Sequence, residues 1–135
     1  MMAWVRRIAA SGFTHVAFAF FMMGGWAFYA NSAHAMPKPL VAAVVQGTLS
    51  GCITLFLKTV IERLSVRFEG MASLVAPPVV ACTLSLCILV LMHKVAATPE
   101  IIATIALPFS VASLYAIIYN FSLWRLRRSI HNGGT

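Results

Sequence analysis

A line of polar side chains runs along one apolar segment of the chain, residues 40–61. Its members recur at every fourth position, which places them on one face of a helix: Gln46, Ser50, Thr54 and Lys58. Gly47 and Gly51 fall within the same arc and have the small-xxx-small spacing that lets two membrane helices approach closely. Two interpretations follow. The face is either a packing seam whose polar groups bond across helices, or a polar track for a lipid headgroup or an ion that ends at Lys58.

Basic and amide side chains at the ends of two apolar segments extend this candidate site. Asn120 falls 62 residues after Lys58 and has the matching place in the last apolar segment. Cations at a membrane surface attract anionic headgroups by about 1 kcal/mol each. The predicted substrate-binding residues are therefore the polar and basic groups of these segments: Gln46, Ser50, Lys58, Arg63, Arg67, Asn120 and Arg125.

Other chemistry finds no support in the sequence. The three acidic residues all lie at the ends of apolar segments: Glu62, Glu69 and Glu100. Proton-coupled carriers usually need a carboxylate inside the membrane, so a small proton-coupled antiporter is disfavoured. The cysteines lack C-x-x-C spacing and are interpreted as small packing residues: Cys52, Cys82 and Cys87. Phosphate-loop, zinc and nucleophile motifs do not occur, so we expect neither catalysis, nor a metal, nor a cofactor.

The elements that must position these residues are four long apolar runs. The chain has 135 residues, of which 61% are hydrophobic and 10% charged, whereas soluble domains average about 45–50% and about 25%. A soluble globular domain is therefore excluded. About 20 apolar residues cross a bilayer, and they must be helical because lipid offers no partner for backbone groups. The prediction is one all-α integral membrane domain, residues 1–135, with spans at about 8–30, 40–61, 71–92 and 101–123.

Three prolines fall inside the predicted helices: Pro77, Pro78 and Pro108. Each removes a backbone hydrogen bond and bends its helix. Membrane helices tolerate such residues because neighbouring groups satisfy the freed carbonyls. The paired proline in the third span either fixes a bend for packing or opens a cavity or a hinge.

Basic residues predict the orientation of the spans. One side of the membrane receives eight of the ten Lys and Arg residues: Arg6, Arg7, Lys58, Arg63, Arg67, Arg125, Arg127 and Arg128. The other side receives only Lys38 and Lys94. Because cytoplasmic loops carry the excess of positive charge, we expect both termini in the cytoplasm. The first apolar run is longer than the core of a signal peptide, so we expect it to stay as a membrane helix.

A shift of 62 residues superposes the first two spans on the last two. Pro37 then falls on Pro99, and Arg63-Leu64 falls on Arg125-Leu126. The two halves would be like-oriented hairpins that form an internal repeat, with an axis along the membrane normal. We expect a binding site where the halves meet.

The second and fourth spans both end in segments that mix basic and aromatic residues, Leu57–Phe68 and Tyr119–Arg127. Together with an arginine soon after the start and the two tandem hairpins, they give the chain a layout that resembles the GtrA-like family of small four-helix membrane proteins. The resemblance covers nearly the whole chain. It implies a role in moving polyprenyl-phosphate-linked sugars across the membrane for cell-surface glycan synthesis.

These observations favour a non-enzymatic transporter or flippase component for an anionic amphipathic lipid. We expect it in the bacterial inner (plasma) membrane, as a homo-oligomer or with a partner membrane protein, because four short helices enclose little volume. The alternative is a non-catalytic structural or assembly subunit of a larger membrane complex, with Gly47 and Gly51 at its contact. A passive ion channel is a third hypothesis. The net charge of +7 lies at the membrane interface, so we expect no nucleic-acid partner.

Overall fold

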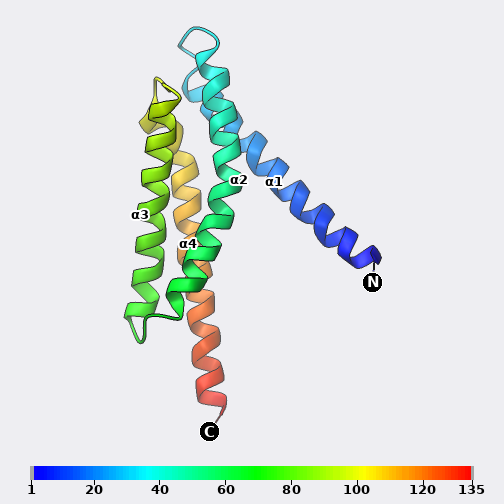
Figure 1. The fold of residues 1–135 in the computed structure, drawn as a ribbon, viewed down its shortest axis with the longest axis vertical. Coiled ribbons are helices and arrows are strands. Elements are labelled where there is room, and N and C mark those ends of the chain that lie inside the picture. Colours follow the sequence, from blue (N-terminus) through cyan, green and yellow to red (C-terminus); the bar gives the residue numbers. More distant parts are fainter. Residues whose placement is uncertain (1, 135) are drawn as a thin grey trace. The chain divides into compact units, whose positions relative to one another are not determined.

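The computed structural model describes residues 2–134, and within them all regular structure is helical. Four helices follow one another along the chain (Figure 1): α1 (Met2–Ala30), α2 (Lys38–Ser65), α3 (Ala72–Val95) and α4 (Ile101–Gly133). Each holds a stretch long and apolar enough to cross a membrane. The prediction of four membrane-type helices is confirmed. The helices run beyond the predicted spans, most of all α4, which continues ten residues past Leu123.

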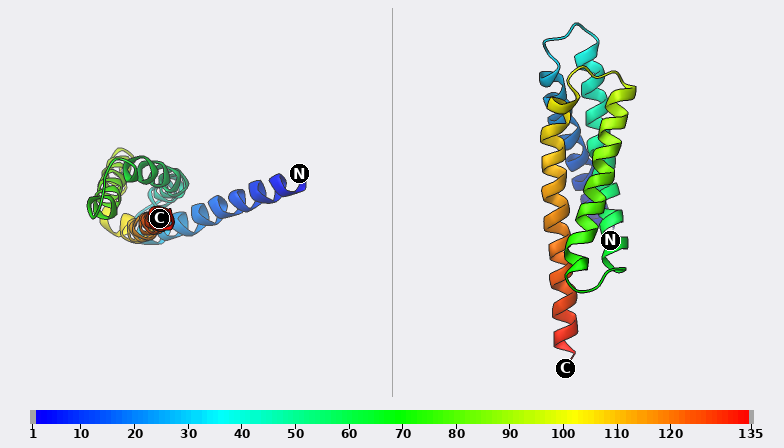
Figure 2. Two further views of the ribbon diagram at one scale, coloured as in Figure 1. Left: turned by 90° about the horizontal axis from the view of Figure 1, so that it is seen from below. Right: turned by 90° about the vertical axis from the view of Figure 1, so that its left-hand side faces the viewer.

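Packing divides the chain into two compact units. The first consists of the chain up to Cys52 together with Val90–Pro108, and the second of Ile53–Leu89 together with the chain from Phe109 onward. The first unit therefore contains α1 and the connections α1–α2 and α3–α4. The second contains the α2–α3 connection and the C-terminal part of α4. Within the second unit α3 and α4 lie side by side in both directions of view (Figures 1 and 2).

In the first unit α1 and α2 approach each other closely at two glycines. A Cβ atom added to Gly24 would lie 2.9 Å from the carbonyl oxygen of Ala43. A Cβ atom added to Gly47 would lie 2.8 Å from Cδ2 of Phe20 and 2.9 Å from its carbonyl oxygen. At Gly51 the nearest atom would be 3.4 Å away, which is an ordinary contact. The tight part of this contact is therefore at Gly47 and at Gly24, a residue outside the predicted seam.

Also in the first unit, α1 binds the segment of α4 that precedes Pro108. A proline at this position leaves the carbonyl group of Thr104 without its helical donor. The Trp26 indole N–H donates to the adjacent carbonyl of Ala103 (3.0 Å). The Asn31 amide donates to the hydroxyl of Thr104 (2.7 Å) and is fully buried. Trp26 of α1 and Asn31, the residue that follows α1, thus bond to α4 next to the carbonyl that Pro108 leaves without a helical donor.

In the second unit, Asn120 of α4 compensates for the paired prolines of α3. Pro77 and Pro78 carry no amide hydrogen, so the helix cannot bond the carbonyls four residues before them. Those carbonyls belong to Ser73 and Leu74. The Asn120 side-chain amide donates to both, with nitrogen–oxygen distances of 3.1 and 2.8 Å. Asn120 is only 1% exposed, so water does not compete for these bonds. One buried amide group therefore replaces the two donors that the prolines remove.

We expect Gly24→Ala to destabilise the protein and Gly25→Ala not to do so. The new Cβ of Gly24→Ala would have to displace the backbone of Ala43, and overpacking of this kind costs about 1–3 kcal/mol. Gly25 is the matched control because a Cβ there has no atom within 4 Å. The measurement is the thermal unfolding midpoint in mild detergent. Equal midpoints for the two variants would show that the contact between α1 and α2 is loose.

We expect Asn120→Leu to destabilise the protein through the carbonyl groups that it leaves unpaired. An unsatisfied buried polar group costs about 1–3 kcal/mol. In a Pro77→Ala/Pro78→Ala background the helix supplies its own donors, so Asn120→Leu should then cost much less. Unfolding midpoints of the four proteins form a double-mutant cycle. The same loss in both backgrounds would mean that Asn120 acts through some other contact.

Candidate functional site

Four side chains with binding chemistry lie on one face of the C-terminal part of α4. Their spacing of three, four and seven residues places them in one narrow arc of the helix: Trp124, Arg127, Arg128 and His131. At about 100° per residue, Arg125 falls outside this arc. The residues stand in the sequence as the pattern W-x-x-R-R-x-x-H, of which Arg127 and Arg128 were used above to predict the orientation of the spans.

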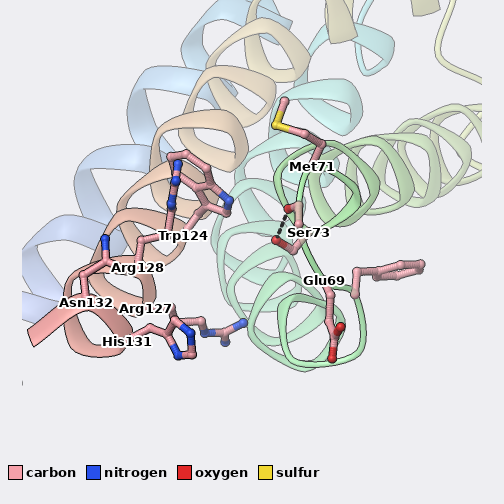
Figure 3. A pocket seen from close by; sticks show the side chains of 10 residues that line it. Glu69, Met71, Ser73, Trp124, Arg127, Arg128, His131 and Asn132 are labelled. Carbon is pink, nitrogen blue, oxygen red and sulfur yellow. Dashed lines mark hydrogen bonds between the residues drawn. The ribbon is translucent and has the colours of Figure 1, made fainter. Parts of the chain in front are cut away.

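This face of α4 borders a pocket of about 640 Å³. Its opposite side is formed by the α2–α3 connection and the first turn of α3, which supply Glu69, Met71 and Ser73 (Figure 3). The connection turns at Gly70, whose φ of +59° suits a residue without a Cβ. The Ser73 hydroxyl donates to the Gly70 carbonyl (2.8 Å) and holds this turn against α3.

Arg127 joins α4 to the end of α2. Its guanidinium donates to the carbonyl oxygen of Ser65 and, at 2.8 Å, to the Ser65 hydroxyl oxygen. Ser65 is the last residue of α2, where carbonyl groups lack helical donors and a positive charge is favoured by the helix dipole. The cation is therefore fixed in place by the protein's own backbone, at the wall of the pocket.

Arg128 is held by an aromatic ring. Its guanidinium carbon lies 4.7 Å from the centre of the Trp124 ring, which is a cation–π contact. The ion pairs within residues 2–134 involve neither Arg127 nor Arg128. The pocket is lined by these two arginines and by one carboxylate, that of Glu69. The planar guanidinium fork matches phosphate and carboxylate groups, which it binds through two parallel hydrogen bonds. The pocket is thus suited to an anionic group.

Lys58, the end of the predicted polar track, is paired with a carboxylate. Its Nζ lies 3.5 Å from Oε1 of Glu62, one helical turn further along α2. The same oxygen accepts a hydrogen bond of 2.5 Å from the hydroxyl of Tyr119. The Tyr119 ring stacks on Tyr115 at 5.5 Å. The charge of Lys58 is therefore balanced within the protein, unlike that of the two arginines in the pocket.

Gln46 and Ser50 belong to the first unit and bond to one another there. Gln46 is fully buried, and its amide nitrogen donates to the Ser50 hydroxyl oxygen (3.1 Å). Its amide oxygen accepts from Nε2 of His93 on α3 (2.9 Å). Because that oxygen can only accept, the hydrogen lies on Nε2, and Nδ1 of His93 accepts from the Thr98 hydroxyl (2.8 Å). These contacts favour the packing interpretation of the polar face at these two residues.

The remaining predicted residues lie in the second unit and do not form one cluster. Arg63, Arg67 and Arg125 are exposed. Asn120 is buried and bonded to the backbone of α3. The sequence did not single out Arg128 as a pocket residue because the positive-inside rule already accounts for any arginine at a membrane edge, and His131 has no sequence signal beyond its spacing from Trp124.

Comparison with models of known protein families, with curated proteins and with solved structures finds no significant match to this chain. The resemblance to GtrA-like proteins therefore rests on the layout of the helices. The case for a binding site rests on the geometry of the pocket itself.

Proposed function

We propose that this chain is an integral membrane protein that binds the headgroup of an anionic amphipathic lipid at the C-terminal part of α4. It acts there as a transporter or flippase component. The observation that carries the proposal is the pocket that Arg127 and Arg128 share with Trp124. The family resemblance suggests polyprenyl-phosphate-linked sugars as the lipid class and glycan synthesis at the cell surface as the process.

The pocket is preorganised for an anion. Arg127 bonds to the end of α2 and Arg128 lies against the Trp124 ring, so these contacts reduce the side-chain freedom that a ligand would have to remove. Tryptophan prefers the level of lipid headgroups, where its ring is partly in hydrocarbon and partly in water. An anionic group attached to an apolar body meets both preferences at once.

The proposal places both chain termini, and with them this pocket, on the cytoplasmic side of a bacterial inner membrane. The eight basic residues on that side support this orientation. The proposal also includes two like-oriented hairpins. In support, His93 lies 62 residues after Asn31, and both are buried polar residues. Asn31 follows the end of α1 and bonds to α4, whereas His93 lies near the end of α3 and bonds to α2.

The alternative function is that of a structural or assembly subunit in a larger membrane complex. The observation that favours it is the surface of α1, where three phenylalanines within nine residues are mostly exposed: Phe13 at 77%, Phe18 at 65% and Phe21 at 74%. A partner helix would pack against this surface. Native purification distinguishes the two functions, because a subunit stays in a stoichiometric complex, whereas a transporter is recovered as an oligomer that retains lipid.

We expect Arg128→Gln to lower the amount of anionic lipid that co-purifies, and Arg125→Gln to leave it near the wild-type level. Hydrogen bonds to charged groups contribute about 1.5–3 kcal/mol, so loss of the Arg128 fork should weaken lipid binding by about tenfold or more. Arg125 is the matched control because the charge change is the same and the residue lies outside the pocket. Phospholipid and polyprenyl phosphate are measured by mass spectrometry, with oligomer integrity checked in mild detergent.

Arg128→Lys adds a further control because it keeps the charge and loses the fork. The proposal requires an intermediate loss of lipid for this variant. If Arg125→Gln and Arg128→Gln lose lipid equally, the attraction is that of a basic surface in general, and the pocket has no specific part in it.

A further inference from the structure

A second cavity lies between α3 and α4 in the second unit, and it is apolar. Its volume is about 520 Å³, which is within the usual range for ligand sites. Pro78, Val79 and Cys82 line it on α3, and Ser113, Ile117 and Phe121 line it on α4. We call this cavity the α3–α4 groove. The small side chains of Cys82 and Ser113 leave room that larger residues would fill.

The groove and the basic pocket have neighbouring lining residues on α3 and on α4. On α3, Ser73 lines the pocket and the next residue, Leu74, lines the groove. On α4, Trp124 lines the pocket and Phe121 lines the groove, and their rings stack with centres 5.9 Å apart. The basic pocket and the apolar α3–α4 groove therefore lie next to each other.

This adjacency identifies the occupant. A free anion would fill the basic pocket and leave the groove empty. A helix from a second copy, with a diameter of about 10–12 Å, would cover the groove, and its apolar surface offers Arg128 no phosphate or comparable group for the guanidinium fork. One hydrocarbon chain attached to a phosphate satisfies both cavities, because the chain gains van der Waals contacts along the groove while its charge meets the arginines.

We propose that the α3–α4 groove binds one hydrocarbon chain of the same lipid whose phosphate occupies the basic pocket. The inference rests on the proposed function and deepens it. It defines the ligand as a phosphorylated amphiphile. The basic pocket recognises its phosphate, and the groove recognises the first part of its hydrocarbon chain. The protein then selects by head and chain together, and neither part alone binds well.

The native cysteines test this inference directly. Cys82 lines the groove, whereas Cys87 on the same helix is exposed and lies outside the groove. The full chain is placed in phosphatidylcholine nanodiscs, and N-ethylmaleimide modification of each thiol is followed by mass spectrometry. Hexadecyl phosphate should slow modification of Cys82 several-fold and leave Cys87 unchanged. Inorganic phosphate and hexadecanol, which supply the head or the chain alone, should give no such protection.

A pair of variants tests the groove without relying on thiol reactivity. Val79→Trp places a large ring in the groove, while Val80→Trp places it on the exposed surface next to it. Val79→Trp should lower the retention of hexadecyl phosphate, and Val80→Trp should not. Equal retention by both variants would overturn the inference.

The outcomes separate this inference from the proposed function. If retention of hexadecyl phosphate depends on Arg128 while Cys82 and the Val79→Trp variant show no effect, the headgroup site stands and the chain site is wrong. If hexadecanol protects Cys82 as well as hexadecyl phosphate does, the groove takes apolar chains without the basic pocket, and the inference is again wrong. If retention depends neither on Arg128 nor on the groove, both proposals fail.

Discussion

The second unit depends on two hydrogen bonds from one amide group. Backbone carbonyls in an apolar medium must be paired, since water is absent and an unpaired group costs several kcal/mol. Pro77 and Pro78 break that rule in α3, and Asn120 restores it from α4. These bonds fix the position of α4 against α3 at one point, and both cavities lie along the same pair of helices. The prolines thus make α3 dependent on α4, and α4 is the helix that carries the basic and aromatic residues of the pocket.

The helices could be predicted from the sequence because bilayer thickness and backbone satisfaction leave few choices. Runs of about 20 apolar residues have one stable structure in lipid. The helix ends were not predictable on the same ground. Hydropathy ends the fourth span near Leu123, but the helix runs to Gly133, since a helix can continue beyond the apolar region where packing and side-chain contacts stabilise it. The ten additional residues include Arg127, Arg128 and His131, so the part of α4 that hydropathy overlooks is the part that builds the pocket.

Contacts between helices are where sequence reasoning reached its limit. The polar face of α2 is visible from a four-residue spacing, but the spacing does not say that Gln46 meets His93 on α3 or that Glu62 meets Tyr119 on α4. Periodicity gives the direction of a side chain around its own helix, and a partner comes from a second helix far away in the sequence. Asn120 shows the same limit. Its polarity near a membrane edge suggests a ligand, whereas its function in the fold is known only once the freed carbonyls of α3 lie beside it.

The shortage of acidic residues explains why the basic pocket remains open to a ligand. The chain has ten Lys and Arg residues and only three Asp and Glu residues, so most cations have no carboxylate to pair with. Arg127 is instead positioned by a carbonyl at a helix end and Arg128 by an aromatic face. Both contacts orient a guanidinium without cancelling its charge, because a carbonyl dipole and a ring quadrupole carry no net charge. A carboxylate in either place would have neutralised the charge of that arginine. The same composition that predicts a membrane protein therefore leaves a pocket with two arginines and one carboxylate, that of Glu69, and hence an excess of positive charge.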